Sequence, residues 1–313
     1  MESLKEKVHR LTVQRFGKTI QLFAPLYLSN ECVDTCLYCG FSRHNKIERK
    51  TLSVTEVLEE AKILINQGFK HLLLVSGEHP KKVSVDYLSE IARTLRPKIA
   101  SLSIEVAPLD EQSYQRLALY GVDGVVIYQE TYDKEVYNQV HIAGPKKDYA
   151  KRLSAVEEAC KAGIRQVGIG VLLGLSPWQK EIQRLIEHAK YLMKRYWQTE
   201  FRISLPRLKP CASSFQAPYP VSDEEFAHII MMLRVALPEL GLVLSTREKP
   251  ELRDQLIYLG VTHMSAGSKT EPGGYAHPEE AGKQFDIEDL RTPAEVARAI
   301  TKAGYEPVWK DWI

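Results

Sequence analysis

The sequence has 313 residues, which is long enough for one large barrel or two ordinary domains. With 42 Lys+Arg against 40 Asp+Glu the net charge is +2, so no broad electrostatic field for nucleic acid or a membrane follows. No apolar run approaches the ~20 residues of a membrane span, and the charged N-terminus lacks the apolar core of a signal peptide. We therefore expect a soluble, cytoplasmic protein whose partners include neither nucleic acid nor a membrane.

Short apolar runs alternate with amphipathic stretches along the chain. After a helical N-terminal segment, residues 1–20, the sequence predicts strands over 22–28, 71–77, 101–107, 124–130, 166–173, 201–206, 241–247 and 261–267. Each strand is followed by a predicted helix, over 53–68, 84–95, 110–121, 150–163, 179–196, 222–237, 249–260 and 292–304. The first of these helices begins with a Ser-x-x-Glu capping box at Ser53 and ends at Gly68.

Eight strand–helix units in strict alternation predict an α/β fold with a parallel sheet and right-handed crossovers. Eight units in 313 residues favour a single (β/α)8 TIM-type barrel, with a doubly wound open sheet as the alternative. No linker or low-complexity tract divides the chain, so we predict one domain over 1–313, with 270–313 as a C-terminal extension of the barrel. Barrel enzymes build their sites where strands end, and unusual polar residues follow each predicted strand here.

Three of the five cysteines, Cys32, Cys36 and Cys39, fall within eight residues. In a reducing compartment such clustering favours a metal over a disulfide. Three thiolates can hold three irons of a cubane, which leaves the fourth iron open to a small molecule with an amino and a carboxylate group. Cys160, in a helical stretch, and Cys211, after a proline, are interpreted as packing residues.

Structural zinc with His44 as a fourth ligand is the alternative for this loop, although His44 lies in a charged segment typical of a solvated loop. The pattern C-x3-C-x2-C followed by Gly, with the aromatic Tyr38 before the last cysteine, resembles the signature of the radical S-adenosylmethionine superfamily. The resemblance implies a [4Fe-4S] cluster on Cys32, Cys36 and Cys39 that cleaves S-adenosylmethionine reductively.

Other residues resemble the cosubstrate contacts of that superfamily. Ser76-Gly77-Glu78, after the second predicted strand, is similar to the Gly-Gly-Glu motif that contacts the methionine amino group. Glu130 and Arg152 resemble the Glu and Arg that hold the methionine carboxylate and amino groups, unless Arg152 is a surface cation. A glycine-rich strand end permits close backbone approach to adenine. The implied cosubstrate contacts are Tyr38, Ser76, Gly77, Glu78, Glu130, Arg152 and Gly170.

A longer series of ordered motifs resembles the aromatic amino-acid lyase branch, and within it the 2-iminoacetate synthases, the tyrosine lyases of thiamine biosynthesis. The motifs include APLYLSNEC, CGFSR, SGEHP, YQETY, SLPRLKPC, LSTRE, MSAGSKTEPGGY and PVWKDW. The implied reaction begins when a 5′-deoxyadenosyl radical takes hydrogen from the tyrosine amino group. The Cα–Cβ bond then breaks to give 2-iminoacetate (dehydroglycine) and p-cresol. The implied partners are a one-electron reductant, flavodoxin or ferredoxin, and thiazole synthase.

Arg247 ends an apolar strand, and its guanidinium can hold a carboxylate bidentately, unless it pairs with Glu248 or Glu251. Ser103 and Glu105 alternate along one strand and share a face. If that face is the lumen, Glu105 is placed to receive the phenol proton or orient the ring. Arg207 either lines the pocket or binds a Glu on a neighbouring loop. The predicted substrate contacts are Tyr27, Ser103, Arg247, Ser265 and Ser268, and the catalytic candidates are Glu105 and Arg247. A simple role as turn residues stays open for Ser265 and Ser268.

Two other functions stay open at this point. One is a lyase of the same chemistry that acts on tryptophan or another aromatic amino acid. The other is a non-catalytic metal-binding interaction module, which would form no 5′-deoxyadenosine under reducing conditions.

Overall fold

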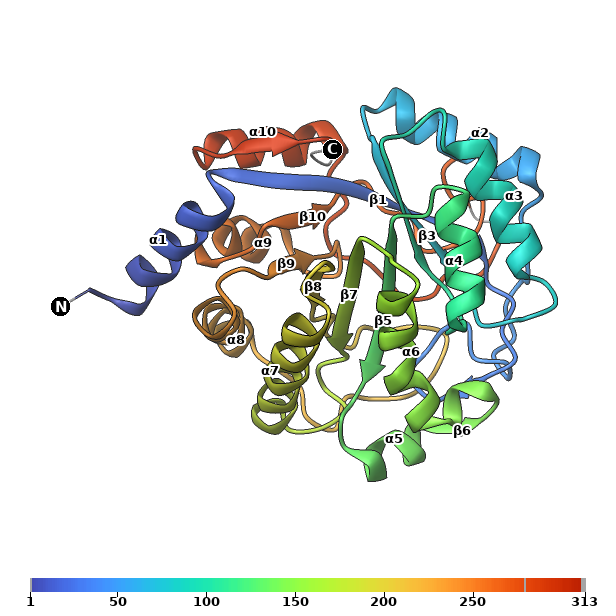
Figure 1. The fold of residues 1–313 in the computed structure, drawn as a ribbon, viewed down its shortest axis with the longest axis horizontal. Helices are drawn as coiled ribbons and strands as arrows, with labels where there is room; N and C mark the ends of the chain where they lie inside the picture. The colour runs from blue at the N-terminus through green and yellow to red at the C-terminus, as the bar shows by residue number, and fades with distance from the viewer. Residues whose placement is uncertain (1, 279, 311–313) are drawn as a thin grey trace.

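Eight parallel strands close into a barrel in the computed structural model, which describes residues 2–278 and 280–310. They are β1 (Thr19–Ser29), β3 (His71–Ser76), β4 (Ser101–Glu105), β5 (Gly124–Glu130), β7 (Gln166–Val171), β8 (Glu200–Ser204), β9 (Gly241–Leu244) and β10 (His263–Ser265). Neighbours pair in that order, and β10 pairs with β1, with Leu22 opposite Met264 (Figure 1). The predicted (β/α)8 barrel is confirmed, and the open-sheet alternative is wrong.

Helices surround the barrel, one after each strand (Figure 1). They are α2 (Val54–Asn66), α3 (Val85–Leu95), α4 (Glu111–Leu119), α6 (Tyr149–Lys161), α7 (Trp178–Arg195), α8 (Asp223–Ala236), α9 (Pro250–Leu256) and α10 (Pro293–Lys302). The hydroxyls of Ser53, Ser222 and Thr292 accept the backbone N–H three residues on, which completes capping boxes on three helices. The helices pack their apolar faces against the outward side of the strands, where residues such as Leu72 are fully buried.

Several short elements lie outside the predicted pattern. They are β2 (Thr35–Cys36), α5 (Lys134–Val140), β6 (His141–Ala143) and β11 (Glu306–Val308), while α1 (Leu4–Phe16) falls in the predicted N-terminal segment. β2 pairs antiparallel with β6, with Cys36 opposite His141, beyond the carboxyl ends of the barrel strands (Figure 1). This pairing fixes the cysteine loop against the segment after α5. The single domain over 1–313 stays a prediction, and its residues 1, 279 and 311–313 lie outside the described part of the chain.

The lower part of the barrel lumen is polar. TIM barrels usually fill this region with bulky branched apolar side chains. Here a methyl group at Gly124 would collide with the Ser103 hydroxyl, so a glycine makes room for a polar neighbour. The cavity at the carboxyl ends of the strands continues down into this region. Its polar lining there consists of His71, Ser103, Gln166, Arg202 and His263.

Within residues 2–278 and 280–310, none of the helices has the length and apolar character needed to cross a bilayer.

A segment between β10 and α10 closes the top of the barrel; we call residues 268–278 and 280–286 the covering segment. Glu60 of α2 is buried, and its carboxylate accepts the backbone N–H groups of Ala276 (2.6 Å) and Tyr275 (3.2 Å). The Tyr275 hydroxyl donates in turn to the carbonyl of Pro25 on β1 (2.7 Å). The covering segment is therefore held to the barrel by one buried carboxylate and one phenol.

Replacing Glu60 by Ala should loosen this anchor. Hydrogen bonds to a charged group contribute about 1.5–3 kcal/mol each, so the loss of two should lower the free energy of unfolding of Glu60→Ala by about 3–6 kcal/mol. We also expect faster proteolysis in the covering segment. Urea denaturation and limited proteolysis measure the two effects. Lys62 is exposed on the same helix, and Lys62→Ala should change stability by less than about 0.5 kcal/mol. Equal losses in both variants would contradict the anchoring role.

Candidate active site

Three cysteines line one cavity at the carboxyl end of the barrel. Cys36 is buried in β2, while Cys32 and Cys39 are half-buried on either side. The backbone N–H of Gly40 donates to the carbonyl of Gln284 in the covering segment (3.0 Å), and a methyl group on Gly40 would collide with that carbonyl. The glycine after the third cysteine thus lets the covering segment pack against the loop.

The chemistry of these thiols fits an iron–sulfur cluster. Burial raises the pKa of the Cys32 thiol to about 12 and raises the pKa of Cys36 and Cys39 above the ordinary value. Thiolates are therefore unfavourable in this cavity unless a cation balances their charge, as bound iron does. His44 is exposed and does not line the cavity. The loop thus offers three thiolate ligands and no histidine.

The two remaining cysteines differ from each other. Cys160 is buried in the main apolar core, as predicted for a packing residue. Cys211 is half-buried, and its thiol donates to the carbonyl of Tyr38 (3.4 Å), directly before the third cysteine of the loop. Cys211 therefore lies beside the cysteine loop, which its place after a proline did not indicate.

Two carboxylates and two cations are buried beside the three thiols. Arg152 donates to the carboxylate of Glu78 (2.7 Å), and its other nitrogen lies 3.9 Å from Glu130. The ammonium of Lys146 lies 2.7 Å from the Glu130 carboxylate and 3.8 Å from that of Glu78. Burial alone would raise the pKa of Glu130, yet Lys146 and Arg152 hold it below its usual value. Arg152 is therefore not a surface cation, and this cluster can bind both the amino and the carboxylate group of an amino acid.

Glu130 also has an unusual backbone. With φ at 68° it is the sole non-glycine residue with positive φ in the described part of the chain. The strand register shifts between Tyr128 and Glu130, which turns the end of β5 toward the cavity. Strained backbone of this kind costs about 1–3 kcal/mol and is concentrated at functional sites.

Lys146 is a residue that the sequence did not reveal. It follows β6, and its backbone N–H donates to the Asp34 carboxylate in the cysteine loop (2.8 Å). The pairing of β2 with β6 places Lys146 beside the cysteine loop. Strands of two and three residues are too short to leave a periodic pattern of apolar residues in the sequence. A Lys-Lys pair after Gly-Pro was the available sign, and it is typical of an exposed turn.

Tyr38 is oriented by a buried histidine. Burial and the nearby Lys146 lower the pKa of His141 to about 3, so its imidazole is neutral. Its Nδ1 faces the carbonyl of Tyr137 (2.8 Å), which can only accept, so Nδ1 carries the hydrogen. The Tyr38 hydroxyl then donates to Nε2 (2.8 Å), and the Tyr38 ring lines the larger cavity described next.

A second, larger cavity occupies the lumen. The residues that line both cavities are Cys39, Glu105, Val126, Tyr128, Glu130, Lys146 and Gln284. All predicted substrate residues line it, namely Tyr27, Ser103, Glu105, Arg247, Ser265 and Ser268. The cosubstrate candidates Ser76, Gly77, Glu78, Glu130 and Arg152 line the smaller cavity. Gly170 lines neither cavity. A methyl group at this position would collide with the Ser204 carbonyl and crowd the Tyr128 ring. Its missing side chain therefore serves strand packing.

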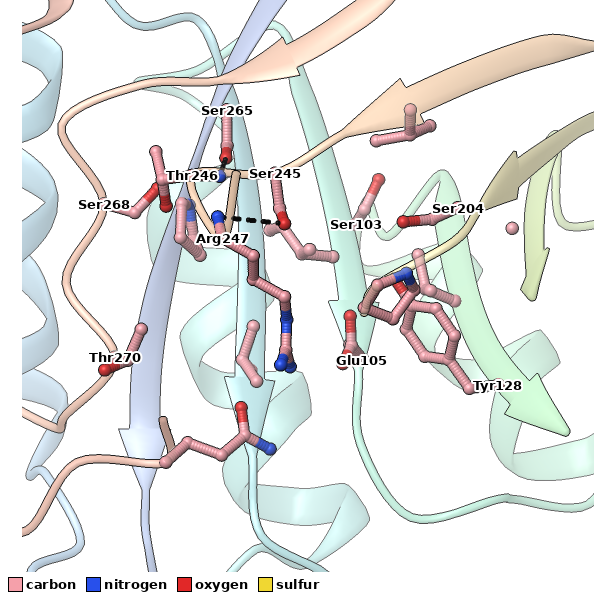
Figure 2. Close-up of a pocket in the computed structure, with 18 of the residues that line it drawn as sticks. Ser103, Glu105, Tyr128, Ser204, Ser245, Thr246, Arg247, Ser265, Ser268 and Thr270 are labelled. Atoms are coloured by element: carbon pink, nitrogen blue, oxygen red, sulfur yellow. Dashed lines mark hydrogen bonds between the residues drawn. The ribbon is translucent and has the colours of Figure 1, made fainter. Parts of the chain in front are cut away.

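Arg247 presents its guanidinium to the larger cavity (Figure 2). The guanidinium carbon lies 3.3 Å from the centroid of the Phe285 ring, which stacks against it. Within the described residues no carboxylate lies at ion-pair distance from Arg247. Glu248, the partner considered from the sequence, pairs with Arg207 instead. One guanidinium nitrogen of Arg247 donates to the carbonyl of Arg207 (3.5 Å), and with no carboxylate partner the group keeps its charge available for an anionic ligand. Arg207 itself binds a neighbouring loop.

Glu105 lies on the wall that faces Arg247 (Figure 2). Burial and the nearby Glu130 raise the pKa of Glu105 to about 7. A carboxyl group poised near neutrality can accept or give a proton at physiological pH.

The hydroxyl groups around Arg247 differ in their availability. The Tyr27 hydroxyl donates to the Gln284 side chain (2.7 Å), and the Ser265 oxygen accepts the backbone N–H of Thr246 (3.2 Å). The buried Ser268 hydroxyl has no hydrogen-bond partner among the described residues and lines the cavity. Ser268 is therefore the hydroxyl best placed to bind a ligand. Gln284 and Phe285, which the sequence analysis missed, reach the cavity from the covering segment.

Comparison with known proteins decides the family. The model of the Radical SAM superfamily matches residues 26–188, and that of the Biotin and Thiamin Synthesis associated domain matches residues 204–306. The chain is 42% identical to the 2-iminoacetate synthase of Salmonella typhimurium and 44% identical to that of Escherichia coli. Both alignments cover 100% of this chain and 83% of the relative. This chain belongs to the 2-iminoacetate synthase family of radical SAM proteins.

Solved structures agree with this radical SAM assignment. The hydrogenase maturase HydG from Carboxydothermus hydrogenoformans is 40% identical, with a TM-score of 0.92, over 97% of this chain and 71% of that one. Methylornithine synthase, at 20% identity and a TM-score of 0.76, over 98% of this chain and 91% of that one, shares the fold. Radical SAM proteins use a [4Fe-4S] cluster and S-adenosylmethionine, so the predicted cofactors are confirmed and the zinc alternative is wrong.

Substituting Lys146 should weaken cosubstrate binding more than turnover. Lys146→Met leaves Glu130 with one distant cation, and we expect the KM for S-adenosylmethionine to rise at least about tenfold, equivalent to about 1.4 kcal/mol. Steady-state formation of 5′-deoxyadenosine with dithionite as reductant measures this. Lys147→Met, at the adjacent exposed position, is the matched control and should leave KM within about twofold. An unchanged KM in Lys146→Met would remove this residue from the cosubstrate site.

Proposed function

We propose that this protein is a carbon–carbon lyase that cleaves the Cα–Cβ bond of L-tyrosine and releases 2-iminoacetate and p-cresol for thiamine thiazole biosynthesis. Identities of 42% and 44% to two 2-iminoacetate synthases along the whole chain support this function. The structural observation that carries it is the junction of two cavities. The three-cysteine cavity opens beside a cavity with a cation on one wall and a carboxyl group on the other.

When bound, the cluster and S-adenosylmethionine supply the 5′-deoxyadenosyl radical that starts the reaction. The chain itself provides placement. We assign Cys32, Cys36 and Cys39 as the iron ligands. The carboxylates of Glu78 and Glu130 can accept hydrogen bonds from the methionine ammonium group, and Arg152 and Lys146 can bind its carboxylate. Because these four charges are already paired and buried, the site is ordered before the cosubstrate arrives.

Tyrosine has an anionic end and a phenol end, and the larger cavity offers a partner for each. Arg247, held flat by Phe285, binds the carboxylate bidentately, and the free hydroxyl of Ser268 adds a hydrogen bond. Glu105 on the facing wall accepts the phenol hydrogen bond and takes up its proton as the side chain leaves as an oxidobenzyl radical. One further electron from the carrier protein and a proton from solvent convert the radical carbon to a methyl group, and Glu105 returns the phenol proton to complete p-cresol. The covering segment excludes water from the radical species.

The partners follow from this chemistry. A one-electron carrier protein, flavodoxin or ferredoxin, supplies two electrons in separate steps, one to the cluster and one for reduction of the cresol radical, and a thiazole synthase consumes the imine. None of the five cysteines is paired in a disulfide, which supports a reducing, cytoplasmic location.

One anaerobic experiment tests the function. Reconstituted protein is incubated with S-adenosylmethionine, dithionite and either tyrosine or tryptophan, and the products are separated by chromatography. We expect p-cresol and 5′-deoxyadenosine with tyrosine, and a loss of at least about a hundredfold in kcat/KM for Arg247→Met. 5′-Deoxyadenosine with tryptophan and an indolic product would assign the other substrate. No 5′-deoxyadenosine with either would show a non-catalytic metal-binding module.

The pH profile tests the role of Glu105. Its ionised form is the proton acceptor, and with a pKa of about 7 that form increases as pH rises from about 6 to 8. The kcat/KM for tyrosine should therefore rise over this range and level off above it. In Glu105→Gln the kcat/KM for tyrosine should be about a hundredfold lower and should lack this rise. A pH effect on the reductant would appear in both proteins and is thereby distinguished. The same rise in the Gln variant would exclude Glu105 as the base.

A further inference from the structure

Two exposed apolar side chains lie next to the cysteine loop. Leu37, between the second and third cysteines, is 40% exposed, and Ile142 of β6 is 47% exposed. Their backbones are neighbours, because Leu37 donates its N–H to the carbonyl of Val140 (3.0 Å) and Cys36 pairs with His141. Apolar residues are thus presented to solvent directly beside a ligand of the cluster.

The surroundings of these two residues are basic. Segments 41–47 and 141–147 contain Arg43, Lys46 and Lys147 on the surface and no Asp or Glu. Both segments meet at Asp34, whose carbonyl accepts the backbone N–H of Arg43 (2.8 Å) and whose carboxylate accepts that of residue 146 (2.8 Å). Acidic residues resume just outside, at 48, 135 and 148. Because the whole chain carries a net charge of only +2, this is a local excess of positive charge.

We propose that this surface, Leu37, Arg43, Lys46, Ile142 and Lys147, is the docking site for an acidic one-electron carrier protein of the flavodoxin type. The proposal rests on the proposed function only in requiring that an electron reach the cluster. We call the surface the docking face. It combines a small apolar centre with a basic rim, as suits the small, transient interfaces of electron-transfer partners. The basic rim steers an acidic partner and raises its association rate.

The position of the docking face explains why it suits this partner. Electron transfer falls steeply with distance, and Leu37 lies in the loop that carries all three cysteines. On the inner side the same loop is covered by Gly40 packed against Gln284. In the docked complex one electron leaves the reduced flavin of the carrier and enters the cluster, so the carrier is oxidised by one electron and the cluster charge falls by one.

Paired charge and apolar substitutions test the docking face. The variants are Ile142→Glu and Lys147→Glu, neither of which is a proposed ligand of cluster, cosubstrate or substrate. The matched controls are Leu119→Glu and Lys98→Glu, exposed positions at the opposite end of the barrel. Stopped-flow bleaching of the cluster absorbance by a reduced bacterial flavodoxin measures electron transfer. Calorimetric titration of flavodoxin at low and high salt measures binding without any turnover.

We expect cluster reduction by flavodoxin to be at least about tenfold slower in both docking-face variants. Reduction by dithionite should stay within about twofold of the unsubstituted protein, and both controls should behave like that protein. Added salt should slow the reduction of the unsubstituted protein by flavodoxin, and it should slow the reduction of Lys147→Glu to a smaller extent. Equal flavodoxin rates in docking-face and control variants would overturn the proposal. So would a dimer in sedimentation experiments that these variants dissociate, since a second copy would then occupy the surface.

The outcome is separable from that of tyrosine cleavage. If dithionite-reduced protein forms no p-cresol while flavodoxin reduction depends on the docking face, the proposed substrate is wrong and the docking face stands. If p-cresol forms and the docking-face variants accept electrons from flavodoxin normally, the docking face is wrong and tyrosine cleavage stands.

Discussion

A buried group of four charges holds the candidate active site together. Glu78, Glu130, Lys146 and Arg152 come from four different elements and meet beside the cysteines. Removing one partner of a buried pair typically costs about 3–5 kcal/mol, because the other charge is left uncompensated. The four segments are therefore fixed relative to one another by charge, at the place where geometry matters most for the chemistry.

The strained backbone of Glu130 fits this view. Its positive φ is unfavourable for a residue with a side chain, and the ion pair with Lys146 offsets that cost. Lys146 is in turn held by Asp34, so the strain at the end of β5 is balanced by contacts that reach the cysteine loop. We infer that cosubstrate site and cluster loop form one unit, and that the loop is ordered largely by residues far from it in sequence.

The barrel and the three-cysteine loop were predictable because each depends on local pattern. Alternating apolar runs and amphipathic stretches mark the eight barrel strands and their helices, and three closely spaced cysteines need no tertiary information to be recognised. Lys146 was not predictable, because its role depends on Glu130 across a two-stranded pairing too short to leave a periodic signature. Gly170 illustrates a further limit, since a glycine-rich strand end looks the same in sequence whether it admits a cofactor or a neighbouring strand.

The covering segment shows most clearly what sequence order conceals. Gln284 lies 245 residues after Cys39, yet its amide nitrogen is 4.0 Å from that thiol, and its oxygen accepts the Tyr27 hydroxyl of the substrate cavity. One side chain thus touches both the cluster loop and the wall of the substrate cavity. A movement of this segment would open both at once. Closure of the larger cavity and of the three-cysteine cavity therefore depends on the same piece of chain, and Glu60 on α2 anchors it.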